Sequence, residues 1–318
     1  MPIEVIYVVR HGFRSNWLVN PSTGDYSSHL RSPTGIAADP ALTSHGVDQA
    51  KQLAAHLIKA EPPVDRVYSS PYYRCLQTIE PFVALWAKQN KAANPVILGE
   101  AGLSEWYGSA SFEHPTSAPP EKLKQLFPAF DSTYVPAVVP SRMGETIAQL
   151  HNRVAMTMDA LIRHCDKSGA RAVLLCSHAA TIIALGRVLT GNMPDTVETE
   201  DFRAFTCGLS VYRRRSDTQA AVDNPIGQEV TEPSRETLEH IKASSPQGAA
   251  SHNDCSNDLP GPSSPRRFSG DESFSGDQQK AAQQDAGVEL GMVVEGKRSG
   301  PRLQHTQQRL VKLGFHYY

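Results

Sequence analysis

Two histidines each follow an apolar stretch of the sequence. His11 follows the run Val5–Val9, with Arg10 between them. His178 follows directly after Ala172–Ser177. Short apolar runs rich in β-branched residues predict buried strands, and strands that are apolar throughout are typical of a parallel sheet covered on both faces. Because ligands of such sheets bind beyond the carboxyl ends of the strands, we expect both histidines at one site. The alternative is a structural role for each ring.

Three arginines are predicted near the same edge of the sheet. Arg10 and Arg14 flank His11, and Arg74 falls in the first turn of a predicted helix that follows a short strand. A guanidinium matches phosphate oxygens with two parallel hydrogen bonds and stays charged at any working pH. Such a cluster is costly without an anion, so it predicts a phosphate-sized ligand. The alternative for each arginine is an ordinary salt bridge.

Strands and helices alternate along the chain and would position these residues. Strands are expected over 6–9, 66–69, 95–98, 172–177 and 207–212, and helices over 43–58, 71–80, 122–127, 144–165 and 179–189. This alternation predicts an α/β fold with a mostly parallel sheet flanked by helices. We expect residues 16–41 to form a long polar loop and residues 108–142 to form an insertion over the sheet edge.

Helix starts and breaks are also predicted from residue type. Thr43 or Ser44 is a suitable N-cap, and so is Ser70, with Pro71 as the first helical residue. Pro81 is expected to kink or split the helix that begins there.

The composition is that of an ordinary protein with a core. The chain has 318 residues, 40% of them hydrophobic, and a formal net charge of −2. No basic excess favours direct nucleic-acid binding, and no apolar run is long enough for a membrane span or a secretory signal. The five cysteines have no paired spacing, which favours a reducing compartment. We expect an intracellular protein of the nucleus, the cytoplasm or both, with no membrane partner.

The composition changes near residue 215. Residues 216–318 are rich in Ser, Gly, Gln and Pro and carry 14 acidic and 10 basic residues. They lack the periodic apolar pattern that offsets the entropy of ordering. We therefore predict one domain over 1–215 and a low-complexity, mostly disordered tail over 216–318.

Several motifs together resemble the histidine phosphatase superfamily, which includes phosphoglycerate mutases and acid phosphatases. In chain order they are Val8–Gly12, Leu42–Ala50, Ser69–Thr78, Gly144–Thr146 and Cys176–Ala179. The resemblance covers about residues 3–212. It implies an α/β phosphoglycerate mutase-like fold. It also implies that His11 is the nucleophile that takes the phosphoryl group, and that Arg10, Arg74 and His178 form the phosphate pocket.

The positions of two further residues resemble the pattern of one branch of that superfamily. Arg14 stands three residues after His11, and Glu105 stands before Trp106. Both are similar to the phosphatase domains of the ubiquitin-associated/SH3 proteins. The run Arg10–Trp17 resembles even more closely the phosphatase-like tau subunit of the fungal RNA polymerase III transcription factor TFIIIC. The resemblance implies Arg14 as a phosphate ligand. Glu105 is the best candidate for proton donor and base, although other acidic residues lie nearby in the sequence, namely Glu100, Glu113 and Asp131.

The expected activity is metal-independent hydrolysis of a phosphomonoester through a phosphohistidine on His11. The substrate would be a small phosphoester or a phosphotyrosyl protein. No cofactor and no metal are expected, because there is no HExxH, no CxxC and no histidine pair close in sequence. The remaining helical histidines are expected to be solvated or to cap helices, namely His45, His56, His151 and His164.

Two other functions stay open. The chain could be a scaffold subunit of TFIIIC with weak or vestigial activity, in contact with other TFIIIC subunits. It could also be a true mutase, although nothing in the sequence specifies the closed sugar-phosphate pocket that a mutase needs.

Overall fold

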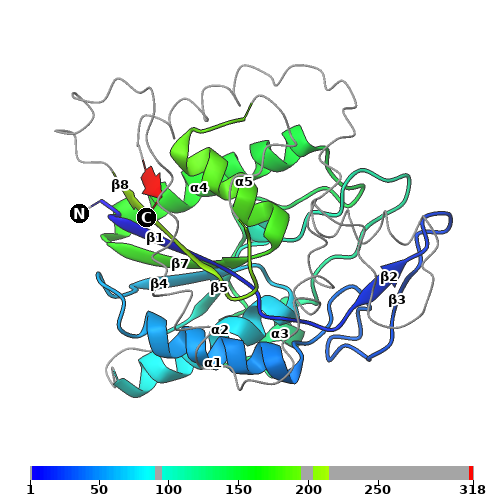
Figure 1. Ribbon diagram of the computed structural model, residues 1–318, viewed down its shortest axis with the longest axis horizontal. Helices are drawn as coiled ribbons and strands as arrows, with labels where there is room; N and C mark the ends of the chain where they lie inside the picture. Colours follow the sequence, from blue (N-terminus) through cyan, green and yellow to red (C-terminus); the bar gives the residue numbers. More distant parts are fainter. Residues whose placement is uncertain (1, 90–94, 195–202, 215–314, 318) are drawn as a thin grey trace.

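The computed structural model of the chain describes residues 2–89, 95–194, 203–214 and 315–317. Within them, the centre is a seven-stranded sheet in the order β6-β5-β4-β7-β1-β8-β9 (Figure 1). Its strands are β1 (Val5–Arg10), β4 (Arg66–Ser69), β5 (Ile97–Gly99), β6 (Phe130–Asp131), β7 (Ala172–Ser177), β8 (Leu209–Arg214) and β9 (Phe315–Tyr317).

The sheet is mostly parallel, as the sequence predicts. Strands β6, β5, β4, β7 and β1 run parallel to their neighbours, whereas β8 and β9 are antiparallel additions at one edge. Every residue of β1 and β7 is buried. Burial on both faces explains why these two strands are apolar throughout rather than alternating.

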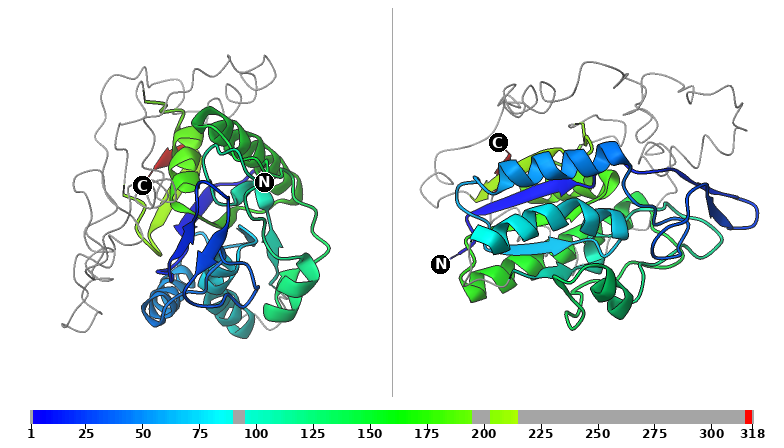
Figure 2. Two further views of the ribbon diagram at one scale, coloured as in Figure 1. Left: turned by 90° about the vertical axis from the view of Figure 1, so that its right-hand side faces the viewer. Right: turned by 90° about the horizontal axis from the view of Figure 1, so that it is seen from below.

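Helices cover both faces of the sheet, and the views of Figures 1 and 2 show the three layers. They are α1 (Ser44–Leu57), α2 (Tyr73–Gln89), α3 (Pro120–Leu126), α4 (Ile147–Ser168), α5 (Ala179–Thr190) and the short 3₁₀ helix η1 (Ala101–Leu103). Val5, Tyr7 and Val9 of β1 join the core cluster that includes the buried faces of α1 and α2. Ile6 and Val8 point the other way, into the cluster with α4 and α5.

Two long connections carry more structure than expected. Residues 16–41 contain a hairpin of β2 (Trp17–Val19) and β3 (Tyr26–Ser28), which projects at the right of Figure 1. The prediction of a plain loop was therefore wrong. The insertion 108–142 supplies α3 and also the edge strand β6, so it extends the sheet.

The start of α2 also differs from the prediction. Thr43 caps α1 as expected, since its side chain accepts from the Gly46 N–H. In contrast, α2 begins at Tyr73, so Ser70 is not its N-cap and Pro71 precedes the helix. Pro81 lies inside α2 without splitting it. The helix is anchored on both sides of this proline by buried side chains, which offset the missing backbone hydrogen bond.

The predicted tail lies almost entirely outside the described residues. Of 216–318, only Phe315–Tyr317 are described, as strand β9 paired with β8. Among the described residues, no helix combines the length and apolar composition that crossing a membrane requires.

Candidate active site

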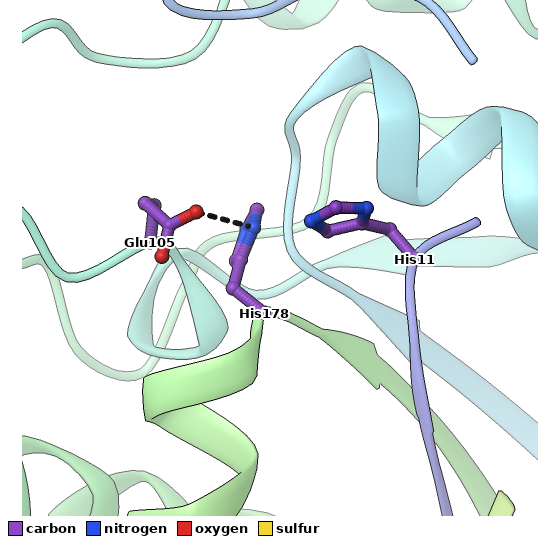
Figure 3. Close-up of side chains that lie close together, drawn as sticks. All are labelled: His11, Glu105 and His178. Carbon is purple, nitrogen blue, oxygen red and sulfur yellow. Dashed lines mark ion pairs between the residues drawn. The ribbon is translucent and has the colours of Figure 1, made fainter. Parts of the chain in front are cut away.

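His11 and His178 lie side by side because their strands are neighbours in the sheet. Arg10 of β1 pairs with Ser177 of β7, and the His11 N–H donates to the Ser177 carbonyl over 3.0 Å. The two ring centroids lie 5.3 Å apart, with their planes inclined at 64°. Figure 3 shows His178 at the junction of β7 and α5. Its ring lies between the ring of His11 and the carboxylate of Glu105.

Hydrogen bonding of the His11 ring decides which nitrogen can react. Nδ1 lies 2.8 Å from the Gly12 carbonyl oxygen, which can only accept, so Nδ1 carries the proton. Nε2 therefore holds the lone pair. Burial, followed by the charges of Arg10 and Arg74, holds the pKa of His11 well below its ordinary value. His11 is thus a neutral imidazole at neutral pH, which is the form that a nucleophile needs.

The chain beyond His11 is packed between Gly46 of α1 and Thr78 of α2. A Cβ on Gly12 would lie 2.8 Å from the Gly46 carbonyl oxygen, so no side chain fits there without a shift of the backbone. The Gly12 N–H donates to Thr78 Oγ1 over 2.9 Å. Thr78 lies one turn after Arg74 on α2 and bonds to its carbonyl. This contact connects the histidine loop to the helix that carries the arginine.

Arg74 is fully buried and held from two sides. Its Nη1 donates to the Ala38 carbonyl over 3.0 Å and lies 3.3 Å from Asp39 Oδ1. Its Nη2 lies 3.1 Å from Glu105 Oε2 and 3.2 Å from His178 Nδ1. Its Nε has no hydrogen-bond partner among the described residues. A buried donor without a partner costs free energy, which an added oxygen ligand would recover.

Glu105 is a buried carboxylate on the segment that follows η1. Its Oε2 lies 3.2 Å from His178 Nδ1, the ion pair dashed in Figure 3, and Oε1 accepts from the Trp106 N–H over 3.1 Å. Burial favours the neutral acid, but the charges of His178, Arg74 and Arg14 outweigh it and lower the pKa of Glu105 to about 2. Glu105 is therefore ionised in the ligand-free site.

His178 has the opposite electrostatic balance from His11. Burial acts to lower its pKa, but the Cys75 sulfur and the Glu105 carboxylate outweigh burial and leave the pKa above its ordinary value. Its Nε2 lies 2.8 Å from Ser70 Oγ and 3.6 Å from Cys75 Sγ. His178 also stands immediately before α5, whose first N–H groups and dipole favour an anion.

Arg10 and Arg14 complete the cluster. Both are buried, and both contribute to lowering the pKa of His11. Arg10 Nη1 donates to the Ala204 carbonyl over 2.9 Å. Arg14 Nη1 donates to the Ser15 carbonyl over 3.2 Å, and its guanidinium carbon lies 5.8 Å from the centroid of the Trp17 ring. All six predicted site residues are thus buried and lie in one region. Four of them are in successive contact: Arg74 contacts Glu105, Glu105 contacts His178, and the ring of His178 packs against that of His11.

The sequence reasoning missed three neighbours of this cluster. Asp39 contacts Arg74, and burial raises its pKa to about 6. Ser70 contacts His178, although its position before a proline had indicated a helix cap. Cys75, in the first turn of α2, contacts the same ring. The only sequence signal for Ser70 and Cys75 is that they flank Arg74 within the motif Ser69–Thr78.

Three of the predicted site residues, His11, Glu105 and His178, are of types that also bind metals. The nearest donor atoms of His11, Glu105 and His178 all lie within 4.8 Å of one another. Arg10, Arg14 and Arg74 surround them, and three fixed positive charges oppose a cation and favour an anion.

Comparison with known proteins places this site in a family context. The family model described as histidine phosphatase superfamily (branch 1) matches residues 6–224. The chain is 33% identical over 235 residues to the transcription factor tau 55 kDa subunit of Saccharomyces cerevisiae, which covers 70% of this chain and 50% of that protein. It is 26% identical over 211 residues to the ecdysteroid-phosphate phosphatase of Drosophila melanogaster, covering 59% of this chain and 27% of that one.

A third relative shows the same pattern of partial coverage. The ubiquitin-associated and SH3 domain-containing protein A of Homo sapiens is 27% identical over 211 residues, which cover 59% of this chain and 31% of that protein. The chain thus spans half or less of the length of these curated relatives.

The solved structures agree at the level of the fold. The crystal structure of the ecdysone phosphate phosphatase from Bombix mori in complex with tungstate superposes with a TM-score of 0.51 at 21% identity. The superposition covers 74% of this chain and 99% of that one. With the family model matched from the first strand to beyond the last parallel strand, the chain belongs to the histidine phosphatase superfamily, branch 1.

Proposed function

We propose that the chain is a metal-independent phosphomonoester hydrolase that passes the phosphoryl group first to His11 and then to water. The observation that carries this proposal is the buried His11 ring, whose Nδ1 lies 2.8 Å from the Gly12 carbonyl oxygen and whose pKa is lowered by burial and by the nearby charges of Arg10, Arg74 and Arg14. The same geometry would suit a small phosphoester or a phosphotyrosyl protein.

The phosphate group binds where the positive charges converge. Arginine guanidiniums and the N-terminus of α5 both favour oxyanions, and the Arg74 Nε is a donor that has no partner in the part of the chain that the structure describes. Burial strengthens these interactions because little water competes for the charges. These fixed cations stabilise the charge on the equatorial phosphate oxygens, where a protein contributes most to phosphoryl transfer.

The first step forms the phosphohistidine. The His11 Nε2 lone pair attacks phosphorus in line, a P–N bond forms, and the P–O bond to the organic group breaks. The bonding electrons leave with the oxygen of the leaving group, which takes up a proton. His178 and the guanidiniums hold the transferred oxygens throughout.

Glu105 supplies that proton and later takes another from the attacking water. In the ligand-free site its carboxylate is ionised because His178, Arg74 and Arg14 lie close. A bound phosphate adds negative charge beside Glu105 and engages the same arginines, so the pKa of the carboxyl rises. In the first step the protonated Glu105 donates its proton to the leaving oxygen. In the second step the resulting carboxylate takes a proton from the attacking water. Water cleaves the P–N bond, and phosphate and neutral His11 result.

The test is hydrolysis of para-nitrophenyl phosphate in the presence of a metal chelator. Wild-type protein should turn over, and His11→Ala should not. His56→Ala is the matched control, because His56 is an exposed histidine on α1 and its loss should leave turnover unchanged. Turnover by His11→Ala at the wild-type rate, or no turnover by folded wild-type protein, would overturn the proposal.

A second candidate function rests on the 33% identity to the tau 55 kDa subunit. In this reading the chain is a scaffold subunit of TFIIIC in the nucleus, and catalysis is weak or secondary. Its partners are the other TFIIIC subunits, with no direct contact to nucleic acid or membrane. Affinity capture of the tagged full chain from nuclear extract tests it. Recovery of TFIIIC subunits with both wild type and His11→Ala supports the scaffold, whereas their absence from both refutes it.

A further inference from the structure

One motif of the sequence has no role in the chemistry described so far. It is Gly144–Thr146, between the insertion and α4. Gly144 adopts a φ of +77°, and a Cβ there would lie 1.9 Å from the Gly108 carbonyl oxygen. Thr146 caps α4 in a capping box with Gln149. Backbone geometry therefore explains the glycine and the threonine, but not the glutamate between them.

Glu145 forms a buried ion pair with Arg153, two turns along α4. Arg153 Nε lies 2.8 Å from Oε1 and 2.9 Å from Oε2 of that carboxylate. The two side chains are only 9% and 3% exposed. Burying such a pair costs desolvation free energy that hydrophobic residues of similar size would not, so its presence indicates a specific task.

Arg153 also contacts the segment that carries Glu105. Its Nη1 donates to the Gly102 carbonyl over 2.8 Å and to the Ser104 carbonyl over 3.0 Å. On the other side of Glu105, the Trp106 indole N–H donates to the Glu145 carbonyl over 2.7 Å. The chain is thus fastened immediately before and immediately after Glu105 by the two members of one ion pair.

We propose that Arg153, oriented by Glu145, is a positioning residue that sets the distance between Glu105 and the reacting phosphate. The inference rests on the proposed function, because it assigns a role to the proton transfer by Glu105. The hydrogen bonds of the Arg153 guanidinium go to Glu145, Gly102 and Ser104, and not to the residues around the proposed phosphate. A displacement of a reacting group by about 1 Å can cost on the order of 10²-fold in rate, so a rigid fastening of this segment has kinetic value.

The experiment compares Arg153→Lys with Arg214→Lys. Lysine keeps the charge but cannot bond to the carboxylate and two carbonyls together. Arg214 is the matched control because it pairs with Asp166 near the other end of α4, at 2.8 and 3.0 Å, away from Glu105. Both variants replace a two-pronged guanidinium–carboxylate pair that anchors α4 with a single ammonium, but only Arg153→Lys loses the contacts to the carbonyls of residues 102 and 104.

The readout is kcat on two substrates that differ in leaving group. Phenyl phosphate needs a proton on its leaving oxygen far more than para-nitrophenyl phosphate does. Arg153→Lys should lower kcat for phenyl phosphate by about 10- to 100-fold and for para-nitrophenyl phosphate much less, as Glu105→Gln should. Arg214→Lys should change both substrates equally or neither.

The outcomes separate the inference from the proposed function. If Glu105→Gln shows the leaving-group effect and Arg153→Lys behaves like Arg214→Lys, the positioning role is refuted while the phosphatase mechanism stands. If folded wild-type protein has no turnover, both are refuted. If wild type turns over but Glu105→Gln shows no leaving-group effect, the proton-transfer role of Glu105 and the positioning role of Arg153 are refuted, and hydrolysis through His11 is judged by His11→Ala. Should Arg153→Lys fail to fold, Glu145→Gln decides, because it keeps the side-chain volume and removes only the charge that orients Arg153.

Discussion

The two histidines occupy equivalent places in the sheet and yet have opposite electrostatics. Each follows the last residue of a buried parallel strand, and the strands are neighbours. His11 is surrounded by cations, and its pKa is well below the ordinary value. His178 contacts Glu105 and Cys75, and its pKa is raised. Position in the fold brings both rings to the site, but the neighbours from other elements give them different protonation states.

Under the proposed function, this difference gives each ring one role. The ring that stays neutral can attack phosphorus, and the ring that tends to stay protonated can stabilise a phosphate oxygen. Because these states come from neighbours rather than from the strands, each assignment can be altered by one substitution.

Substitution of each histidine by asparagine should separate attack from stabilisation. His11→Asn should abolish turnover, since the amide nitrogen of asparagine is a hydrogen-bond donor with no free lone pair to form the P–N bond. His178→Asn should lower kcat by about 10²–10³-fold, the usual cost of removing one donor to a developing oxyanion. The second measurement is the phosphoprotein formed from an aryl phosphate labelled in its phosphoryl group, quenched with detergent at alkaline pH because a phosphohistidine is labile to acid. Label retained by His11→Asn would contradict the assignment.

Glu105→Gln should reduce the difference between the two histidines. Without the carboxylate, only the Cys75 sulfur still opposes burial and Arg74, so the pKa of His178 should fall. At the same time kcat should fall by about 10²–10⁴-fold with the lost acid and base. NMR titration of the histidine ring protons measures the pKa, with His56 as an internal reference on the surface. An unchanged His178 would show that Glu105 does not set its protonation.

Stability should respond to pH in opposite directions at the two rings. The folded-state pKa of His11 is lowered, so the unfolded chain binds more protons and stability is lost as the pH falls below about 6.5. The folded-state pKa of His178 is raised, so its contribution is present below about 6.5 and is lost as the pH rises through the folded value.

Urea unfolding at several pH values measures this contrast. His11→Ala should be less sensitive to acid than the wild type, and His178→Ala should be less sensitive to a rise above about pH 6.5. Identical pH profiles in the two variants would show that the rings share one environment.

Ser70→Ala should give the smallest effect. It removes the 2.8 Å contact to His178 Nε2 and should cost about 1–3 kcal/mol of stability because a buried ring nitrogen loses its partner. We expect kcat to change by about tenfold or less, which corresponds to no more than about 1.4 kcal/mol of that cost falling on the transition state. Thermal unfolding and kcat are measured beside Ser28→Ala, which removes an exposed serine contact on the hairpin.

The sequence predicted the sheet and the strand-end histidines well because both depend on local pattern. The apolar runs that form β1 and β7 are uninterrupted, and each ends at a residue able to do chemistry. Arg74 was also predicted correctly to lie in the first turn of a helix after a strand. The roles assigned to these residues stay predictions until the variants above are measured.

Residues that act through distant contacts could not be predicted from local pattern. Ser70 reaches a ring 108 positions away, and Asp39 reaches an arginine 35 positions away. His151 was expected to be solvated or capping, and this was wrong. It is buried on α4, where its Nδ1 donates to the Ile147 carbonyl over 2.8 Å. The position of a polar ring on a broad apolar helix face depends on what packs above it.

The in-register pairing of Arg10 with Ser177 has a consequence for how such a pocket can change over time. A slip of one residue between the two strands would move the histidines apart by about 3.3 Å and would exchange the faces of an entire core strand. The spacing of the two rings is therefore fixed by the register of two core strands. If the proposed function holds, a descendant that abandoned catalysis would keep the spacing of these two strand ends, and would lose activity by replacing side chains at them.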